Sequence, residues 1–79
     1  MERYFYHINN GNGYTRDEEG QELPHDRSVR EIALLSVRSL IGDELKNGTI
    51  DLTGRIEVTD ADGACVLQLP FTDAVEILR

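Results

Sequence analysis

The sequence predicts an α+β fold in which one helix covers one face of an antiparallel sheet of about four strands, in the order ββαββ. Residues 26–46 carry apolar residues at a helical spacing. The stretches on either side alternate apolar and polar residues and are divided by turn-forming dipeptides. At 79 residues, the chain is expected to form a single small domain, residues 1–79.

The predicted helix over residues 26–46 is amphipathic. Leu35 is the apolar residue of this stretch that falls outside the apolar arc, on the opposite side among charged and polar residues. The arc therefore predicts the face of the helix that packs on the sheet. It consists of Val29, Ile32, Ala33, Leu34, Val37, Leu40, Ile41 and Leu45, with the small Ser36 among them.

Capping signals bound this helix at both ends. Asp26 is one candidate N-cap, and Ser28 with Glu31 three residues later forms a capping box that is the other. Both candidates begin the helix within the same turn. At the other end, Asn47 and Gly48 supply the left-handed residue that commonly ends helices.

The residues before the helix predict a hairpin. Residues 3–9 alternate as a strand, and residues 10–13 contain the Asn-Gly dipeptide twice, so a tight reversal is expected at one copy or the other. Residues 14–17 then return beside the first strand, and residues 18–23 form a second turn and a short extended piece. The core-facing residues of the first strand are Tyr4, Tyr6 and Ile8.

A second hairpin is predicted after the helix. Residues 50–58 place apolar residues at even positions, which predicts one long half-buried strand. The acidic loop at residues 60–63 is a hairpin signal whose last two residues would form a type I′ turn. A strand order of 2-1-3-4 makes every neighbouring pair antiparallel. Residues 72–79 are compatible with a helical turn or with an added edge strand.

The register of the second hairpin follows from this turn. It places Val58 opposite Leu67. It also places Ile56 opposite Leu69, so both apolar rows share one face and no bulge is needed. Cys65 then belongs to the inward row, and we expect its thiol to be buried and unreactive.

Composition excludes several classes of partner. Fifteen Asp and Glu against eight Lys and Arg give a net charge of −7, which disfavours binding to a nucleic acid backbone. No apolar run is long enough for a signal peptide or a membrane span, and one cysteine cannot form an internal disulfide. We therefore expect a cytoplasmic protein without nucleic acid or membrane partners.

Candidate chemical sites are weak. The loop at residues 60–63 resembles half of a calcium loop, but Leu69 stands where the ligand Glu would be. A zinc site would have to bring together His7, His25 and Cys65 from separate elements. We therefore expect no metal site, no cofactor and no catalytic residue.

Several segments of the chain form a pattern that resembles a family of short bacterial proteins of unknown function, common in rhizobia and related alphaproteobacteria. The resemblance covers nearly the whole chain. It implies a bacterial cytoplasmic protein, and it carries no catalytic or binding residue to this sequence. The segments are residues 3–8, Gly11, Asp17, residues 20–23, Asp62-Gly63 and residues 69–71.

Three classes of function remain. The preferred one is a non-enzymatic interaction or structural module acting as a homo-oligomer, because a chain this small has a thin margin of stability. A small acidic regulator of another protein is the alternative, and a small enzyme or metal-binding protein is a remote one. We expect a two-fold dimer that uses the sheet face opposite the helix or an edge strand. The candidate interaction residues are Phe5, His7, Arg55 and Val66 on the sheet and Leu35 on the helix.

Overall fold

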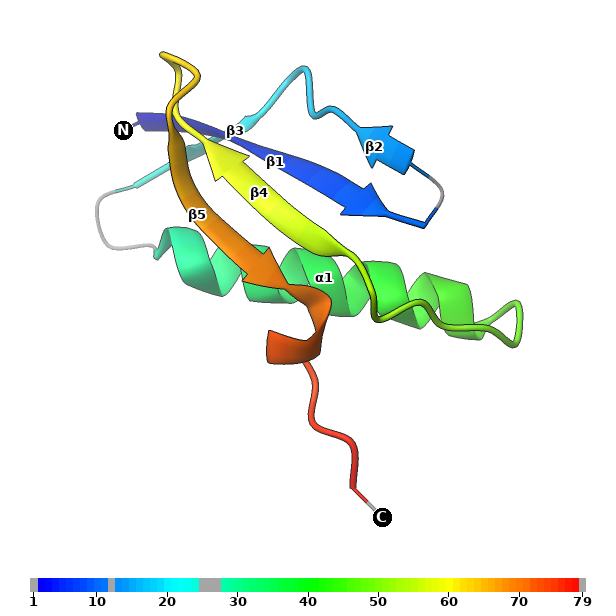
Figure 1. Ribbon diagram of the computed structural model, residues 1–79. Coiled ribbons are helices and arrows are strands. Elements are labelled where there is room, and N and C mark those ends of the chain that lie inside the picture. Colours follow the sequence, from blue (N-terminus) through cyan, green and yellow to red (C-terminus); the bar gives the residue numbers. More distant parts are fainter. Residues whose placement is uncertain (1, 12, 25–27, 79) are drawn as a thin grey trace.

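One helix lies across one face of a five-stranded antiparallel sheet in the computed structural model, which describes residues 2–11, 13–24 and 28–78 (Figure 1). The predicted α+β class is confirmed. The elements in chain order are β1 (Glu2–Asn10), β2 (Gly13–Thr15), β3 (Gln21–Leu23), α1 (Val29–Leu45), β4 (Arg55–Thr59), β5 (Cys65–Pro70) and the 3-10 turn η1 (Phe71–Asp73).

Strand β1 is the centre of the sheet, whose order is β2-β1-β4-β5. The predicted order of the four main strands is confirmed. The extended piece before the helix is a fifth strand, β3, which shares one side of β1 with β2. Strand β3 pairs with residues 2–4 and β2 with residues 8–10, so residues 5–7 face a gap between the two short strands.

The core lies between the helix and the inner face of the sheet. Tyr6 is buried, and Tyr4 and Ile8 pack against the core, as the alternation of the first strand predicts. Leu45 was expected in the apolar arc but is 57% exposed. The fully enclosed part of the core contains Ala33, Val37, Ile56, Val58, Leu69 and Phe71.

The helix begins at the second of the two candidate caps. Ser28 is the N-cap, and its hydroxyl accepts a hydrogen bond from the Glu31 N–H at 3.3 Å. The alternative cap, Asp26, lies outside the described residues. Gly48 follows the helix with a φ of 83°, as the stop signal predicts.

The predicted long strand over residues 50–58 is wrong, since β4 begins at Arg55. Asp51 is the reason, because its carboxylate accepts hydrogen bonds from the Thr53 N–H and hydroxyl and from the Gly11 N–H. Side-chain bonds of this kind offer the backbone an alternative to the sheet ladder. These hydrogen bonds also lower the pKa of Asp51, and residues 50–54 form an irregular approach to the strand.

The β4–β5 register is confirmed within the strands. Val58 pairs with Leu67 and Ile56 pairs with Leu69. The prediction that no bulge is needed is wrong, because the register shifts between Val58 and Thr59.

The cause of the shift is a longer turn than the one predicted. The Asp60 N–H donates to the Ala64 carbonyl at 2.9 Å, which leaves a three-residue loop that ends at Gly63 with φ 85°. Cys65 therefore pairs with Thr59 on the outer face and is exposed, so the prediction of a buried thiol is wrong.

After β5, the 3-10 turn buries Phe71 and Ala74 against the core. The helical turn, one of the two forms expected for residues 72–79, is present at residues 72–73 as part of η1. Residues 75–78 have no regular structure, and residues 76–78 leave the body of the domain (Figure 1). Ile77 is 66% exposed and Leu78 is 82% exposed. Within the described residues, no helix has the length and apolar character to cross a membrane.

Candidate functional site

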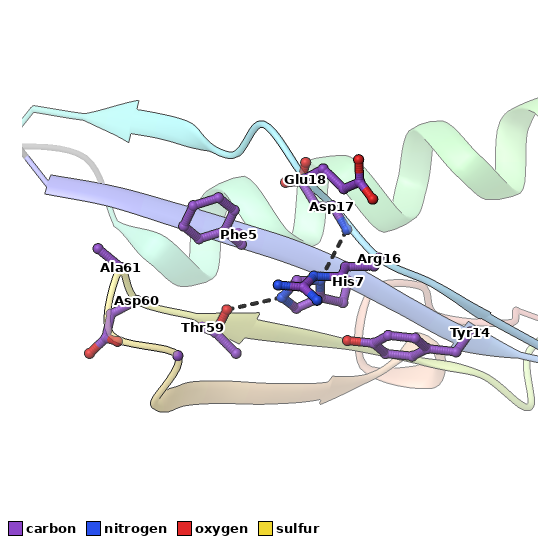
Figure 2. A pocket seen from close by; sticks show the side chains of 10 residues that line it. Phe5, His7, Tyr14, Arg16, Asp17, Glu18, Thr59, Asp60 and Ala61 are labelled. Carbon is purple, nitrogen blue, oxygen red and sulfur yellow. Dashed lines mark hydrogen bonds between the residues drawn. The ribbon is translucent and has the colours of Figure 1, made fainter.

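Three aromatic rings lie in a row on the outer face of the sheet (Figure 2). Phe5 and His7 are two residues apart on β1 and therefore project to the same side, with ring centroids 6.5 Å apart and an interplanar angle of 7°. Tyr14 reaches across from β2 and stacks on the other side of His7 at 5.8 Å. Sequence alternation predicted the outward side of Phe5 and His7, whereas the position of Tyr14 depends on the return path of β2.

Asp17 binds the segment between β2 and β3 to β1 at the gap that these two short strands leave. Its carboxylate accepts hydrogen bonds from the Tyr6 N–H at 3.0 Å and from the Gly20 N–H at 3.1 Å. Burial alone raises the pKa of Asp17, but hydrogen bonds from the N–H groups of Tyr6, Gly20 and Glu19 outweigh it and hold that pKa below its ordinary value. The carboxylate thus accepts a hydrogen bond from β1 in the gap between β2 and β3, where no strand pairs with β1.

His7 is 5% exposed, so the fold buries it although it lies on the outer face of the sheet. The Asp17 N–H donates to His7 Nδ1 at 3.0 Å, and His7 Nε2 lies 2.9 Å from the Thr59 hydroxyl oxygen (Figure 2). An Nδ1 that accepts a hydrogen bond carries no proton, which assigns the proton of the neutral ring to Nε2. Both ring nitrogens are therefore used within the fold.

We define the outer cleft as the hollow of about 650 Å³ between the segment at residues 14–18 and the turn at residues 60–63. That volume falls within the range of small-ligand and side-chain pockets. Figure 2 shows the aromatic row on its floor and the two chain segments at its rims. Its lining residues are Phe5, His7, Tyr14, Arg16, Asp17, Glu18, Thr59, Asp60, Ala61 and Gly63.

The charged side chains of the outer cleft differ in whether they form hydrogen bonds or ion pairs within the fold. One oxygen of Asp60 accepts the N–H groups of Asp62 and Ala64, so that side chain shapes the turn. Arg16 and Glu18 are exposed and form no hydrogen bond or ion pair with the described parts of the chain. These two side chains are therefore free to meet a ligand.

We define the apolar hollow as a second depression, of about 260 Å³, on the helix side of the sheet. The bulge in β5 leaves Val66 47% exposed at its edge. The Tyr4 hydroxyl donates to the Glu2 carboxylate at 2.7 Å, and this bond raises the pKa of Tyr4. The lining residues are Tyr4, Ser28, Val29, Arg30, Val66 and Leu67.

The five predicted interaction residues do not form one surface. Phe5 and His7 line the outer cleft, whereas Val66 lines the apolar hollow on the other side of the sheet. Arg55 is exposed beside Glu57, with Nε 2.9 Å from a carboxylate oxygen. Leu35 is 54% exposed on the helix, as its place outside the arc predicts.

Sequence reasoning did not single out Tyr14 or Arg16 as site residues, and it considered Asp17 only as a weak metal ligand, a role it rejected in favour of a solvated turn. The available signal was Asp17 at the start of the turn that ends at Gly20, because Asp in that position commonly binds backbone N–H groups ahead of it. Across residues 2–11, 13–24 and 28–78, no group of three or more His, Cys, Asp and Glu is placed to hold a metal ion.

Comparison with known proteins gives one match. The family model described as a domain of unknown function (DUF6894) matches residues 3–72. No curated protein and no solved structure matches the chain. The match includes the sheet except for its first residue, Glu2, together with the helix and the outer cleft, and it ends before the exposed apolar residues of the C-terminal segment.

Proposed function

We propose that this chain, which belongs to the family of the domain of unknown function DUF6894, is a non-enzymatic protein-interaction module that forms a two-fold homodimer. One observation carries the proposal. The fold exposes Ile77 and Leu78 on a segment that leaves the domain, and it also presents a mostly apolar hollow that its own side chains leave open. Exposed apolar groups of this kind mark contact sites.

The occupant that we propose for the apolar hollow is the segment with Ile77 and Leu78 from a second copy. Charge complementarity supports this choice. Arg30 lines the hollow and Glu76 directly precedes the two apolar residues, and neither forms an ion pair with another described residue. Exchange in both directions gives an isologous dimer, in which the same two surfaces meet twice.

The size of the contact predicts a weak dimer. Burying an Ile or Leu side chain contributes about 1.5–3 kcal/mol, so the four side chains of two segments contribute about 6–12 kcal/mol. Loss of translational and rotational freedom opposes association by about 4–15 kcal/mol. The most favourable balance of these two terms is about 8 kcal/mol, which corresponds to a dissociation constant of about 1 μM, so the dimer is expected to be no tighter than the micromolar range.

The other two surfaces considered for a dimer are less suitable. The outer sheet face is partly covered, since the segment with Tyr14 and Asp17 lies over His7. The free edge of β5 contains a bulge and ends in Pro70, and both features disfavour pairing with another strand.

Sedimentation equilibrium from low to high micromolar concentration tests the dimer. The unmodified protein is expected to approach twice the mass of the chain, and Val66→Glu to remain monomeric because it places a charge in the apolar hollow. Leu35→Glu is the matched control, since it introduces the same charge at an exposed site on the helix. A monomeric unmodified protein at high micromolar concentration contradicts the proposal.

A charge exchange tests the orientation of the contact. Arg30→Glu and Glu76→Arg are each expected to weaken the dimer, and the two substitutions together to restore it. If the double variant dissociates more than either single variant, the two side chains do not meet across the interface.

The small acidic regulator is the second candidate, favoured by the net charge of −7 and by the charges of the outer cleft. The location that we propose is the cytoplasm, which a single cysteine without an internal partner favours. A bacterial, mainly alphaproteobacterial, distribution stays a prediction from the resemblance.

A further inference from the structure

The outer cleft contains an aromatic surface that the fold leaves open. Tyr14 is 55% exposed although it stacks on His7, and Phe5 is half-buried at the other end of the row. Aromatic faces attract cations, most strongly when the cation also sheds water in a hollow. The rings therefore give the cleft a preference for a flat or cationic group.

Few hydrogen-bonding groups in the cleft are available to a neutral polar ligand, because hydrogen bonds within the fold already engage them. Both nitrogens of His7 are engaged, and both oxygens of Asp17 accept backbone N–H groups. What remains for a ligand is the ring surface and the charges at the rims.

Those charges have an excess of negative sign. Among the described residues that line the cleft, Asp17, Glu18 and Asp60 stand against one cation, Arg16. His7 adds no charge while its Nδ1 accepts the Asp17 N–H. The local field therefore has the same sign as the net charge of −7, and both favour a cationic ligand.

We infer that the outer cleft binds the guanidinium group of an arginine in a basic segment of a partner protein. A guanidinium is planar, stacks on aromatic rings and donates two parallel hydrogen bonds to a carboxylate. Tyr14 provides the ring face and Glu18 the carboxylate that has no other bond among the described residues. This inference is independent of the homodimer, whose surface lies on the helix side of the sheet.

Arg16 gives the inference a sharp consequence. It is a cation on the same lining and forms no ion pair with any described residue, so it opposes a second guanidinium. Arg16→Gln is therefore expected to tighten binding. Glu18→Gln, which keeps the shape of the side chain and removes its charge, is expected to weaken it by about two- to fivefold.

The test is an NMR titration of the full chain with a blocked Gly-Arg-Gly peptide. Amide shifts are expected at residues 14–18 and 59–63, and they are expected to be lost when citrulline, the neutral isostere, replaces arginine. Tyr14→Leu is expected to weaken binding by about two- to fivefold through loss of the ring face. Free arginine as a second probe shows whether the side chain alone is sufficient.

Two controls separate this inference from general attraction to an acidic protein. Glu31→Gln removes the same charge from an exposed site on the helix and is expected to leave the affinity unchanged. Val66→Glu, which tests the homodimer, is expected to leave the shifts at the cleft in place. Equal shifts with the citrulline peptide, or equal losses from Glu31→Gln and Glu18→Gln, overturn the inference.

Discussion

Replacement of Asp17 by alanine is expected to destabilise the fold by about 2–4 kcal/mol. The substitution removes the acceptor of two backbone N–H groups, those of Tyr6 and Gly20. A hydrogen bond to a charged group contributes about 1.5–3 kcal/mol, and the sum is reduced here because water reaches the half-buried carboxylate. The N–H of Tyr6 accounts for most of the loss, since Tyr6 is a buried residue.

A loss of about 2–4 kcal/mol is large relative to the total stability of the domain. A domain of this size has a free energy of unfolding of roughly 4–12 kcal/mol. Urea denaturation followed by circular dichroism measures the difference as a lower midpoint at unchanged slope. Glu18→Ala is the matched control, because the neighbouring side chain is exposed and free of hydrogen bonds to the described residues. If the free energy of unfolding of Asp17→Ala lies within about 0.5 kcal/mol of that of the unmodified protein, roughly the range of ordinary surface substitutions, the role given to Asp17 is wrong.

The same carboxylate predicts a dependence on pH. Its pKa is lowered in the folded state, so its contribution is complete above the ordinary value of 3.8 and is lost as the pH falls through the lowered value. The difference in stability between the unmodified protein and Asp17→Asn is therefore expected to be constant near neutral pH and to shrink below pH 3.8. A difference that grows on acidification contradicts this assignment.

Three further predictions concern the frame of the molecule. Gly54→Ala is expected to lower the free energy of unfolding by about 2 kcal/mol or more in urea denaturation, because the new Cβ would lie 2.7 Å from the Asn9 carbonyl oxygen. The matched control is Gly42→Ala, whose Cβ would meet nothing within 4 Å and which is expected to raise the free energy of unfolding by up to about 1 kcal/mol. Cys65 is expected to react with a thiol reagent under native conditions, and protection of the thiol would contradict the bulged register. Burial raises the pKa of Tyr6 to about 12, so its share of stability is present below pH 10.0 and is lost as the pH rises through 12, which alkaline unfolding with Tyr6→Phe as reference measures.

The fold was predictable where apolar periodicity and turn chemistry agreed. The helix face, the inward row of β1 and the β4–β5 pairs follow from the periods of 3.6 and 2. The errors arose where a short polar side chain competed with the ladder. Asp51 binds nearby N–H groups and replaces the start of the long strand, and Asp60 lengthens the turn and reverses the side of Cys65.

The outer cleft was predictable in part. Parity placed Phe5 and His7 on the outer face, but it does not report what covers that face. The cover comes from Tyr14 on the short strand β2 and from Asp17 in the irregular segment that follows it. Long-range contacts of an irregular segment have no period in the sequence, so this part required the structure.

The central place of β1 also governs the order in which the chain becomes structured during synthesis. Tyr6 pairs with Val58, so the first strand has no main partner on that side until residues 55–59 have been made. At roughly 5–20 residues per second, the ribosome needs about 3–10 s to add the intervening chain. During that interval the edge of β1 that later pairs with β4 is open to chaperones and to neighbouring nascent chains. Nascent chains whose translation is stalled at residue 48 are therefore expected to bind chaperones, whereas nascent chains extended until residue 70 has left the ribosome are not.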